Sequence, residues 1–370
     1  ESRAELRKVL QEMLSRLGES HFGILPQEAL AALGQGEEED SLEGDLGLQT
    51  RPLGGKVVVW RVEEAGPAAT AGVRPGWILV AVDGRDLAQR IALLPDDLDA
   101  LTHRSMVGHI VERALRGPVG SEARLRVLDG EDQEVAITLQ RTRPEVEMSS
   151  FGNLPPLPVE LVHEHLSRDG IEVGLIRFNI WLIPVSASFD EALDAERGSD
   201  GVILDLRGNP GGLGGMAMGM AGHFLDEKLA LGTMTTRGTE LRFTVNPRRV
   251  NPQGERVRPY AGPLAILVDG FSGSTSEIFA GGMQALERAR IFGEPSAGAA
   301  LPSRLSELPN GDILQHAFAD YVDPHGRRLE GRGVIPDTIT PLRREDLLAG
   351  KDAALDAALE WIRAESRRVR

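Results

Sequence analysis

The chain contains 370 residues, of which 41% are hydrophobic, and its formal net charge at pH 7 is -15. This length predicts two or three domains, and the acidic balance disfavours binding to a nucleic-acid backbone. The chain has no cysteine, which excludes disulfides and thiol catalysis, and no apolar run reaches the roughly 18 residues that a membrane-spanning helix needs.

Residues 1–44 are predicted to form an N-terminal helical segment. A helix is expected from Ala4 to Leu17, and a second, short helix near Pro26 to Leu33. The acidic run Glu37 to Asp40 indicates a solvated, mobile loop. Because the chain begins at Glu1 without a methionine, we expect a mature or trimmed product that no longer carries a signal peptide.

Residues 45–145 have the turn and strand pattern of a small β-rich domain. The turn Asp45–Gln49 precedes a predicted strand, Val57–Val62, and the stretch Pro67–Leu79 combines a helix signal with a Pro-Gly turn. This pattern resembles a PDZ domain over roughly residues 42–142. A long insertion, Leu87 to Gly120, interrupts it.

The PDZ resemblance implies a peptide-binding turn at Leu46, Gly47 and Leu48. In such turns, backbone N–H groups capture the C-terminal carboxylate of a peptide, which adds a strand to the sheet edge. The alternative is a small β-domain that only packs against the rest of the protein.

Residues 146–370 alternate predicted strands and helices. Pro155–Pro158 indicates a rigid, extended connection into this part of the chain. Strands are expected at Val173–Phe178, Val202–Leu206, Leu264–Val268 and Ala289–Phe292, and helices at Ser188–Ala195, Leu213–Leu225, Ser276–Glu287 and Lys351–Ala364. Such alternation predicts a layered α/β domain.

A serine- and glycine-rich turn, Gly270–Ser276, connects one of the buried strands to a helix. Ser274 and Glu277 have the Ser-x-x-Glu spacing of a capping box. A serine at this junction presents an exposed hydroxyl, and the helix N-terminus offers N–H groups and a positive dipole end to a developing anion. The turn therefore fits either a helix cap or a serine nucleophile.

A glycine-rich turn, Asn209–Gly215, follows the predicted strand Gly201–Leu206. Glycine allows the dihedral angles with which backbone N–H groups turn inward. No Gly-Lys-Ser/Thr follows, so a phosphate-binding loop is disfavoured. Asp205 and Arg207 are predicted to brace this loop by hydrogen bonding rather than to react.

Four sequence blocks stand in order between residues 150 and 345. They are Asp205–Gly212, Ser272–Ile278, Gly293–Gly298 and Glu330–Asp337. Together with the preceding PDZ-like segment, they resemble the C-terminal processing (tail-specific) serine peptidase superfamily. The resemblance implies an α/β crotonase/ClpP-like core with an inserted PDZ-like domain, polypeptide substrates and no cofactor or metal. It also implies a periplasmic or secreted location and leaves a homo-oligomer open.

One element of the Ser–Lys branch of that superfamily is missing. In that branch, the middle serine of Ser-x-Ser-x-Ser is activated by a lysine that follows a Gly-x-x-Thr-Phe-Gly element. Here Ala299 occupies the lysine position, and no lysine lies between Ser274 and Glu330. Because a serine hydroxyl is a poor nucleophile without a base, either another base serves or the site is inactive.

His21 is the candidate base. The stretch Leu14–Gly23 resembles the Ser-His segment of the tricorn-type branch. This resemblance implies a role for each of four residues. Ser274 is the nucleophile, His21 the general base, Ser20 the residue that orients the base, and Glu330 the residue that polarises Ser20. With an ordinary pKa near 6.5, histidine can take a proton at neutral pH and return it to a leaving amine. A surface or helix-terminal histidine is the alternative.

The same resemblance places the oxyanion hole at the N–H groups of Thr275 and of either Gly211 or Gly212. We therefore expect a serine endopeptidase that cleaves unfolded or C-terminally recognised polypeptides, with N-terminal helices docked beside the core. The rival is a catalytically inactive relative that binds peptide termini as a scaffold or chaperone.

Other titratable residues are predicted to have structural or surface roles. His163 and His165 lack the His-x-x-x-His spacing that places two ligands on one helical face, so no metal site is expected there. His103 and His109 are interpreted as surface or packing residues. Two aspartates near the last block, Asp323 and Asp337, are expected to be structural.

Overall fold

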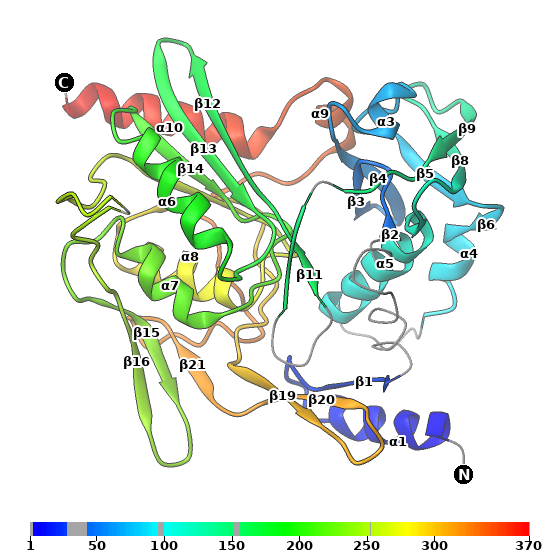
Figure 1. The fold of residues 1–370 in the computed structure, drawn as a ribbon, viewed down its shortest axis with the longest axis horizontal. Helices are drawn as coiled ribbons and strands as arrows, with labels where there is room; N and C mark the ends of the chain where they lie inside the picture. Colours follow the sequence, from blue (N-terminus) through cyan, green and yellow to red (C-terminus); the bar gives the residue numbers. More distant parts are fainter. Residues whose placement is uncertain are drawn as a thin grey trace. The chain divides into compact units, whose positions relative to one another are not determined.

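The computed structural model describes residues 3–27, 43–94, 100–144, 146–150, 156–251 and 253–369 (Figure 1). The chain divides into two compact units. The core unit comprises Glu1–Gly34, Val146–Thr340 and Ala354–Arg370, and the β-rich unit comprises Gln35–Glu145 and Pro341–Ala353. Most of the helix expected at Pro26–Leu33, the whole run Glu37–Asp40, and Pro155 lie outside the described residues.

The core unit is built on a six-stranded sheet with the order β12-β13-β14-β17-β18-β22. Its strands are β12 (Leu161–Arg168), β13 (Ile171–Phe178), β14 (Gly201–Asp205), β17 (Leu264–Val268), β18 (Arg290–Gly293) and β22 (Thr338–Ile339). Only the pair β12 and β13 is antiparallel. Every residue of β14 and β17 is buried, as expected for central parallel strands that are covered on both faces.

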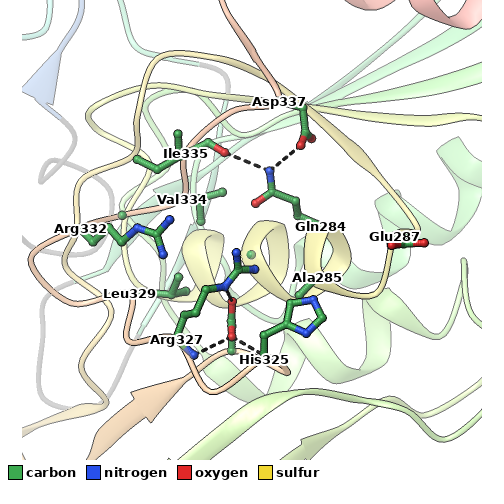
Figure 2. A pocket seen from close by; sticks show the side chains of 13 residues that line it. Gln284, Ala285, Glu287, His325, Arg327, Leu329, Arg332, Val334, Ile335 and Asp337 are labelled. Carbon is green, nitrogen blue, oxygen red and sulfur yellow. Dashed lines mark hydrogen bonds and ion pairs between the residues drawn. The ribbon is translucent and has the colours of Figure 1, made fainter.

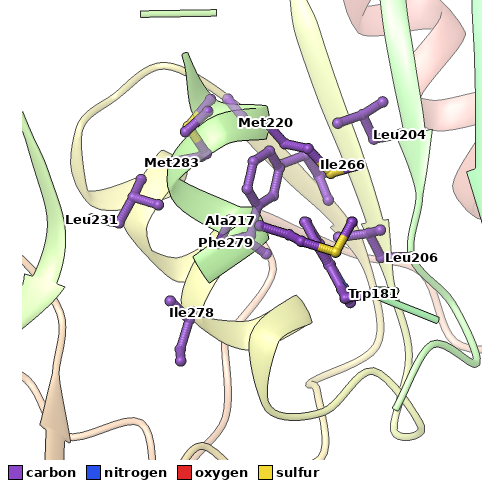
Figure 3. Packing of buried hydrophobic residues seen from close by; sticks show 14 of the residues in the cluster. Trp181, Leu204, Leu206, Ala217, Met220, Leu231, Ile266, Ile278, Phe279 and Met283 are labelled. Carbon is purple, nitrogen blue, oxygen red and sulfur yellow. The ribbon is translucent and has the colours of Figure 1, made fainter. Parts of the chain in front are cut away.

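Helices cover both faces of this sheet. Successive residues of a strand point to opposite faces, so Leu204 packs with the cluster on one face and Ile203 with the cluster on the other. Helices α6 (Val185–Ala195), α7 (Gly214–Ala221) and α8 (Thr275–Ala285) supply the first face, and α10 (Ala353–Val369) supplies the second. Figure 3 shows Trp181 and Phe279 packed in the first cluster. The layered α/β architecture predicted from the sequence is confirmed.

Most element boundaries lie within a few residues of those predicted. The strand Leu264–Val268 is observed as expected. Helix α7 ends at Ala221 rather than at Leu225. The reason is that the Gly222 carbonyl accepts a hydrogen bond from the Arg248 N–H of a crossing loop.

The N-terminal segment docks onto the core unit. Helix α1 (Arg3–Ser15) leads to the short strand β1 (Gly23–Leu25), which pairs with β20 (Ile313–Ala317). The third strand of this small sheet is β19 (Ser303–Glu307), and the order is β1-β20-β19. Docking of the N-terminal segment beside the core, which the sequence predicted, is therefore observed.

Two further small sheets belong to the core unit. One has the order β16 (Glu240–Thr244), β15 (Ala230–Thr235), β21 (Asp320–Val322), and the other pairs β10 (Glu147–Ser149) with β11 (Leu157–Val159). Strand β11 contains Pro158, so the proline-rich stretch is extended, as expected, but it is also paired.

The main sheet of the β-rich unit has six strands, in the order β3-β4-β5-β8-β9 with β6 paired to β5. Their bounds are β3 (Leu48–Leu53), β4 (Lys56–Val62), β5 (Ile78–Val82), β6 (Arg85–Asp86), β8 (Glu122–Leu128) and β9 (Glu134–Gln140). A separate pair joins β2 (Glu43–Gly44) to β7 (Gly117–Pro118), and the helices are α3 (Pro67–Thr70), α4 (Leu87–Ile91), α5 (Ala100–Leu115) and α9 (Arg344–Leu348). The predicted insertion thus consists largely of α4 and α5.

Two details of the β-rich unit bear on the predictions. Val107 and Val111 of α5 pack in its core, whereas His103 and His109 are exposed, as expected. The C-terminal stretch Pro341–Ala353, expected within the core domain, clusters with the β-rich unit because Leu347 packs into its apolar cluster.

Candidate active site

Ser274 stands out among the three serines of the Ser-x-Ser-x-Ser turn. Ser272 and Ser276 are fully buried, and their hydroxyls donate to Leu206 O (2.8 Å) and Asn209 O (3.0 Å). Ser274 is partly exposed and has a left-handed backbone with φ 51°. Backbone strain in a non-glycine residue persists only where the surroundings enforce it, which is frequent at active sites. Of the three serines, Ser274 is therefore the one whose side chain is not fully buried and bonded to a backbone carbonyl, and it also forms the predicted capping box with Glu277.

Glu277 holds the turn that carries Ser274. Its carboxylate is fully buried and accepts the Ser274 N–H (3.1 Å) and the Ala299 N–H (2.8 Å) at one oxygen. The other oxygen accepts the Ser296 hydroxyl (2.6 Å) and the Gly298 N–H (2.7 Å). This carboxylate therefore ties the start of α8 to the loop 296–299.

Burial raises the pKa of Glu277 to about 7, although its four donors act in the opposite direction. A carboxyl whose pKa is higher in the folded than in the unfolded state stabilises the fold below its unfolded pKa, and that contribution is lost as the pH rises through the folded value. We expect the difference in unfolding free energy between the native protein and Glu277→Gln to change by about 3 kcal/mol between pH 4.5 and pH 8. Denaturant titrations at both pH values measure this change, and parallel pH dependences in the two proteins would contradict it.

The glycine-rich loop lies directly against the Ser274 turn. A Cβ added to Gly211 would stand 2.6 Å from the Ser274 Cβ and 2.9 Å from the Thr275 nitrogen. The loop is fixed by buried Asn209, whose side chain donates to Phe178 O (2.9 Å) and accepts the Gly211 N–H (3.0 Å). Only glycine fits at this point of the loop, because a side chain would overlap the serine turn.

The hydrogen bonds distinguish the two glycines. The Gly211 N–H is occupied by Asn209. Within the described residues the Gly212 N–H has no acceptor, because the bridge to Trp181 uses Gly211 O and Leu213 N instead. The Thr275 N–H lies at the first position of α8, where no intrahelical partner exists. The free donors beside Ser274 are therefore those of Gly212 and Thr275.

Asp205 and Arg207, predicted to brace this loop, pair with each other directly before it. Asp205 is buried and accepts two hydrogen bonds from the Arg207 guanidinium, each of 2.9 Å. The Gly208 N–H that follows donates to Asp269 (2.8 Å).

Ser20, His21 and Glu330 form a continuous hydrogen-bond chain. The Ser20 Oγ lies 2.6 Å from His21 Nδ1 and 3.0 Å from Glu330 Oε2. The same carboxylate accepts the Ser20 N–H (2.6 Å). Because the carboxylate only accepts, the single Ser20 proton goes to Glu330, and His21 Nδ1–H donates to Ser20. This tautomer leaves His21 Nε2 with the free lone pair that a general base needs.

Backbone groups of two neighbouring residues join this chain to the nucleophile turn. Ala299 O accepts the Ser274 N–H (2.8 Å), and the Ala300 N–H donates to Glu330 Oε2 (2.8 Å). No direct hydrogen bond links His21 to Ser274, both of which the structure describes. Catalytic hydrogen bonds often form only when substrate is bound.

Burial lowers the pKa of His21, and the Glu330 charge raises it to a smaller extent. The imidazole is therefore neutral at pH 7, the state in which it can take a proton. Its backbone φ of 60° is left-handed, as at Ser274.

The position of the lysine base of the Ser–Lys branch is occupied by Ala299. Ala299, at the lysine position of the Ser–Lys branch, is bonded to the Ser274 backbone, so a base at that position would lie beside the nucleophile. Lys8, Lys56, Lys228 and Lys351 are all exposed.

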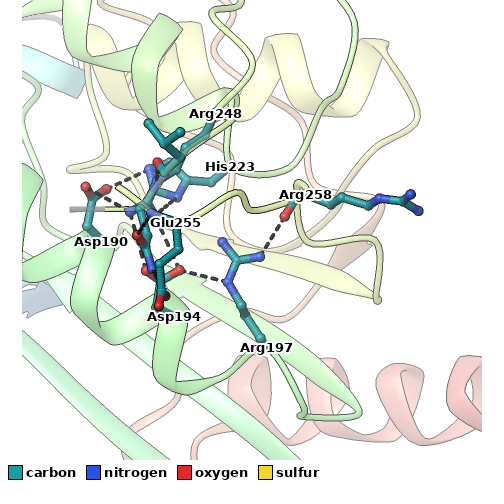
Figure 4. A network of polar contacts seen from close by, with 9 residues as sticks. Asp190, Asp194, Arg197, His223, Arg248, Glu255 and Arg258 are labelled. Carbon is teal, nitrogen blue, oxygen red and sulfur yellow. Dashed lines mark hydrogen bonds and ion pairs between the residues drawn. The ribbon is translucent and has the colours of Figure 1, made fainter. Parts of the chain in front are cut away.

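Other histidines are held in structural contacts. His223 is buried, with Nε2 paired to Asp190 (2.8 Å) and Nδ1 facing the Arg248 guanidinium (3.0 Å) (Figure 4). Both ring nitrogens are occupied, so this Asp–His pair cannot act as a base. His163 and His165 both contact Glu196, at 2.7 and 2.9 Å. The described residues contain no cluster of histidine, aspartate and glutamate that could hold a metal ion.

A cavity of about 340 Å³ lies between α8 and the segment 323–337 (Figure 2). Two pairs of its polar side chains are bonded to each other: Gln284 donates to Asp337 (3.0 Å), and Arg327 donates to Asp323 (2.8 Å). The structural roles predicted for the two aspartates are confirmed, and we assign the cavity no part in the reaction.

In the PDZ-like turn, the Asp45 side chain occupies one of the backbone N–H groups. The Gly47 N–H donates to Asp45 Oδ1 (2.5 Å), and Leu46 and Leu48 are buried. Strand β3 begins at Leu48 and is the first strand of its sheet, with β4 on one side only. Among the described residues, no strand pairs with its other edge.

Two residues were not predicted from the sequence. Asn209 occupies the Gly211 N–H with its side chain and so leaves that of Gly212 free, and Asp312 is a buried carboxylate beside the N-terminal segment. The signal for the first was the Asn-Pro-Gly-Gly order, in which the amide can bond two residues ahead. For the second, no local pattern exists.

Comparison with known proteins defines the class. The peptidase family S41 matches residues 172–340, and the PDZ domain family matches residues 44–139. The carboxyl-terminal-processing protease of Synechocystis sp. is 29% identical over 368 residues, which cover 98% of this chain and 78% of that protein. The chloroplastic carboxyl-terminal-processing peptidase 2 of Arabidopsis thaliana is 27% identical over 281 residues, 74% of this chain and 52% of that protein. The chain thus spans only about half the length of the second relative.

Solved structures agree on the fold. The photosystem II D1 C-terminal processing protease has a TM-score of 0.57 at 23% identity, covering 96% of this chain and 88% of that one. A putative S41 protease from Bacteroides fragilis has a TM-score of 0.61 at 15% identity, covering 98% and 90%. The chain combines a match to a peptidase family with a match to the PDZ domain family, and it is similar to carboxyl-terminal-processing proteases. The inactive scaffold weighed as a rival lacks support.

No helix among the described residues is long and apolar enough to cross a membrane.

Proposed function

We propose that this chain is a serine endopeptidase in which Ser274 is the nucleophile and His21, rather than a lysine, is the general base. The observation that carries this proposal is the chain Glu330–Ser20–His21, which leaves His21 Nε2 as an acceptor in the same unit as Ser274. Four exposed lysines and Ala299 at the lysine position support it.

The proposed reaction begins when His21 Nε2 removes the Ser274 proton and Oγ attacks the scissile carbonyl carbon. The resulting oxyanion accepts the N–H groups of Gly212 and Thr275, which are fixed before substrate arrives. His21 then gives its proton to the leaving amine, and the peptide bond breaks. His21 then removes a proton from a water molecule, whose oxygen attacks the acyl carbon. The bond between that carbon and Ser274 Oγ breaks, His21 returns the proton to Oγ, and the carboxylic acid product leaves.

Ser20 and Glu330 act on the base rather than on the substrate. Through Ser20, the Glu330 carboxylate fixes the tautomer and the ring orientation of His21 and stabilises the imidazolium that forms. These proposed roles resemble the Ser-His arrangement of the tricorn-type branch.

The proposed substrates are unfolded or C-terminally recognised polypeptides. The free edge of β3 and the N–H groups at Leu46, Gly47 and Leu48 would take an extended peptide, once Asp45 releases the Gly47 N–H. A periplasmic or secreted location is part of the proposal. One relative is named as chloroplastic.

A fluorophosphonate probe tests the nucleophile, because it reacts with activated serines. We expect the native protein to be labelled on Ser274, as located by mass spectrometry of the digested protein, and Ser274→Ala to be unlabelled. Ser167→Ala, an exposed serine on β12, is the matched control and should label as the native protein does. Absence of labelling both with and without an apolar-ended peptide would contradict the proposal.

A further inference from the structure

The segment that carries the base is weakly held by apolar contacts. No side chain of α1 that the structure describes is buried, and Leu6, Val9 and Met13 are 48%, 53% and 59% exposed. Apolar burial is the main favourable term in packing. Polar contacts must therefore decide whether this segment stays docked.

One buried carboxylate provides three of these polar contacts. Asp312 has a side chain only 1% exposed, and it pairs with Arg7 through Nε (2.8 Å) and a terminal guanidinium nitrogen (2.6 Å). It also accepts the Gln27 N–H (2.9 Å) and the Asn310 side-chain N–H (2.8 Å). A two-bond arginine–carboxylate pair is geometrically specific as well as strong.

The position of these partners in the chain is informative. Arg7 precedes the Ser20–His21 pair and Gln27 follows it, so a single side chain holds both ends of the segment that presents the base. Asp312 also adjoins β20, whose Ile313 pairs with Leu25 of β1. By contrast, the Glu19–Arg328 pair next to the base is 32% and 42% exposed, and exposed pairs contribute little.

We propose that Asp312 is a positioning residue for His21. By hydrogen bonding to the Arg7 guanidinium and the Gln27 N–H, Asp312 holds the base-bearing segment against the core, and these contacts are called the clamp. Loss of the clamp removes the base while the core stays folded. This proposal rests on the proposed function, in which His21 is the base. Arg7 hydrogen bonding holds the pKa of Asp312 far below its usual range, so the clamp stays ionised throughout the neutral range.

The test compares Asp312→Asn and Arg7→Met with Glu19→Gln, the exposed pair beside the same base. A misplacement of about 1 Å costs on the order of 100-fold, so we expect the first two variants to lose roughly 10- to 100-fold in kcat with KM within about twofold. Glu19→Gln should stay within about twofold of the native kcat. Because the two clamp residues share one interaction, the double variant should lose no more than the worse single one.

Hydrogen exchange separates this role from a general structural one. In Asp312→Asn, residues 3–27 should lose protection while β14 and β17 keep it. Loss of protection throughout the core would overturn the clamp, as would native kcat in both clamp variants.

The two proposals fail differently. If His21→Ala keeps the native rate, the proposed function is wrong and the positioning role falls with it. If His21→Ala is inactive but Asp312→Asn and Arg7→Met behave as the native protein does, the proposed function stands and only the positioning role is wrong.

Discussion

Replacing His21 with alanine is expected to lower kcat on the order of 10,000- to 1,000,000-fold, because the Ser274 proton then has no acceptor. The residual rate would come from substrate binding and the oxyanion hole alone. Lys228→Ala is the matched control, because Lys228 is exposed and belongs to the residue type that serves as base in the Ser–Lys branch. It should keep the native kcat.

Turnover of an unfolded polypeptide by both variants and the native protein measures this effect. In the native enzyme, kcat/KM should fall with decreasing pH only below the ordinary histidine pKa of about 6.5, because burial lowers the pKa of His21 and the imidazolium cannot take a proton. A strong loss in Lys228→Ala with activity retained in His21→Ala would show that the base has been assigned wrongly.

Replacing Gly212 with alanine is expected to lower kcat by roughly 100- to 1,000-fold, the usual cost of losing one oxyanion-hole donor. Gly212 has φ 142°, and an added Cβ would overlap the Trp181 carbonyl oxygen. The loop must then shift, which moves the free N–H away from the oxyanion position. Because this donor acts mainly in the transition state, KM should change far less than kcat.

Gly215→Ala, in the first turn of the following helix α7, is the control. A Cβ at Gly215 would meet only the Met218 side chain, at 4.0 Å, so this variant should keep the native kcat and unfold at a similar temperature. Steady-state kinetics on both variants give the comparison. Native kcat in Gly212→Ala would exclude its N–H as a donor to the oxyanion.

The sequence predicted the features that depend on local pattern. Buried strands such as Leu264–Val268 are continuous apolar runs between turn residues, and Ser274 stands in a distinctive strand-to-helix turn. The sequence also shows alanine rather than lysine at position 299. In the structure the Ala299 carbonyl accepts the Ser274 N–H, so this position lies beside the serine.

Other features depend on contacts that no local pattern carries. The choice between Gly211 and Gly212 required the position of the Asn209 side chain. Asp312 and Arg7 are 305 positions apart, and an aspartate in an Asn-Gly-Asp turn looks like an ordinary turn residue. The packing of Leu347 in the β-rich unit was missed for the same reason, since a single leucine does not reveal its partner.

The pairing of β1 with β20 also bears on how the chain folds. The N-terminal segment pairs with β20 and contacts Asp312 and Glu330, which lie 285 and 310 positions from their partners Gln27 and Ser20. Contacts between such distant positions form late, because the loop between them must close first. We therefore expect the segment that carries His21 to dock in a late step of folding, after the strands of the central sheet have paired.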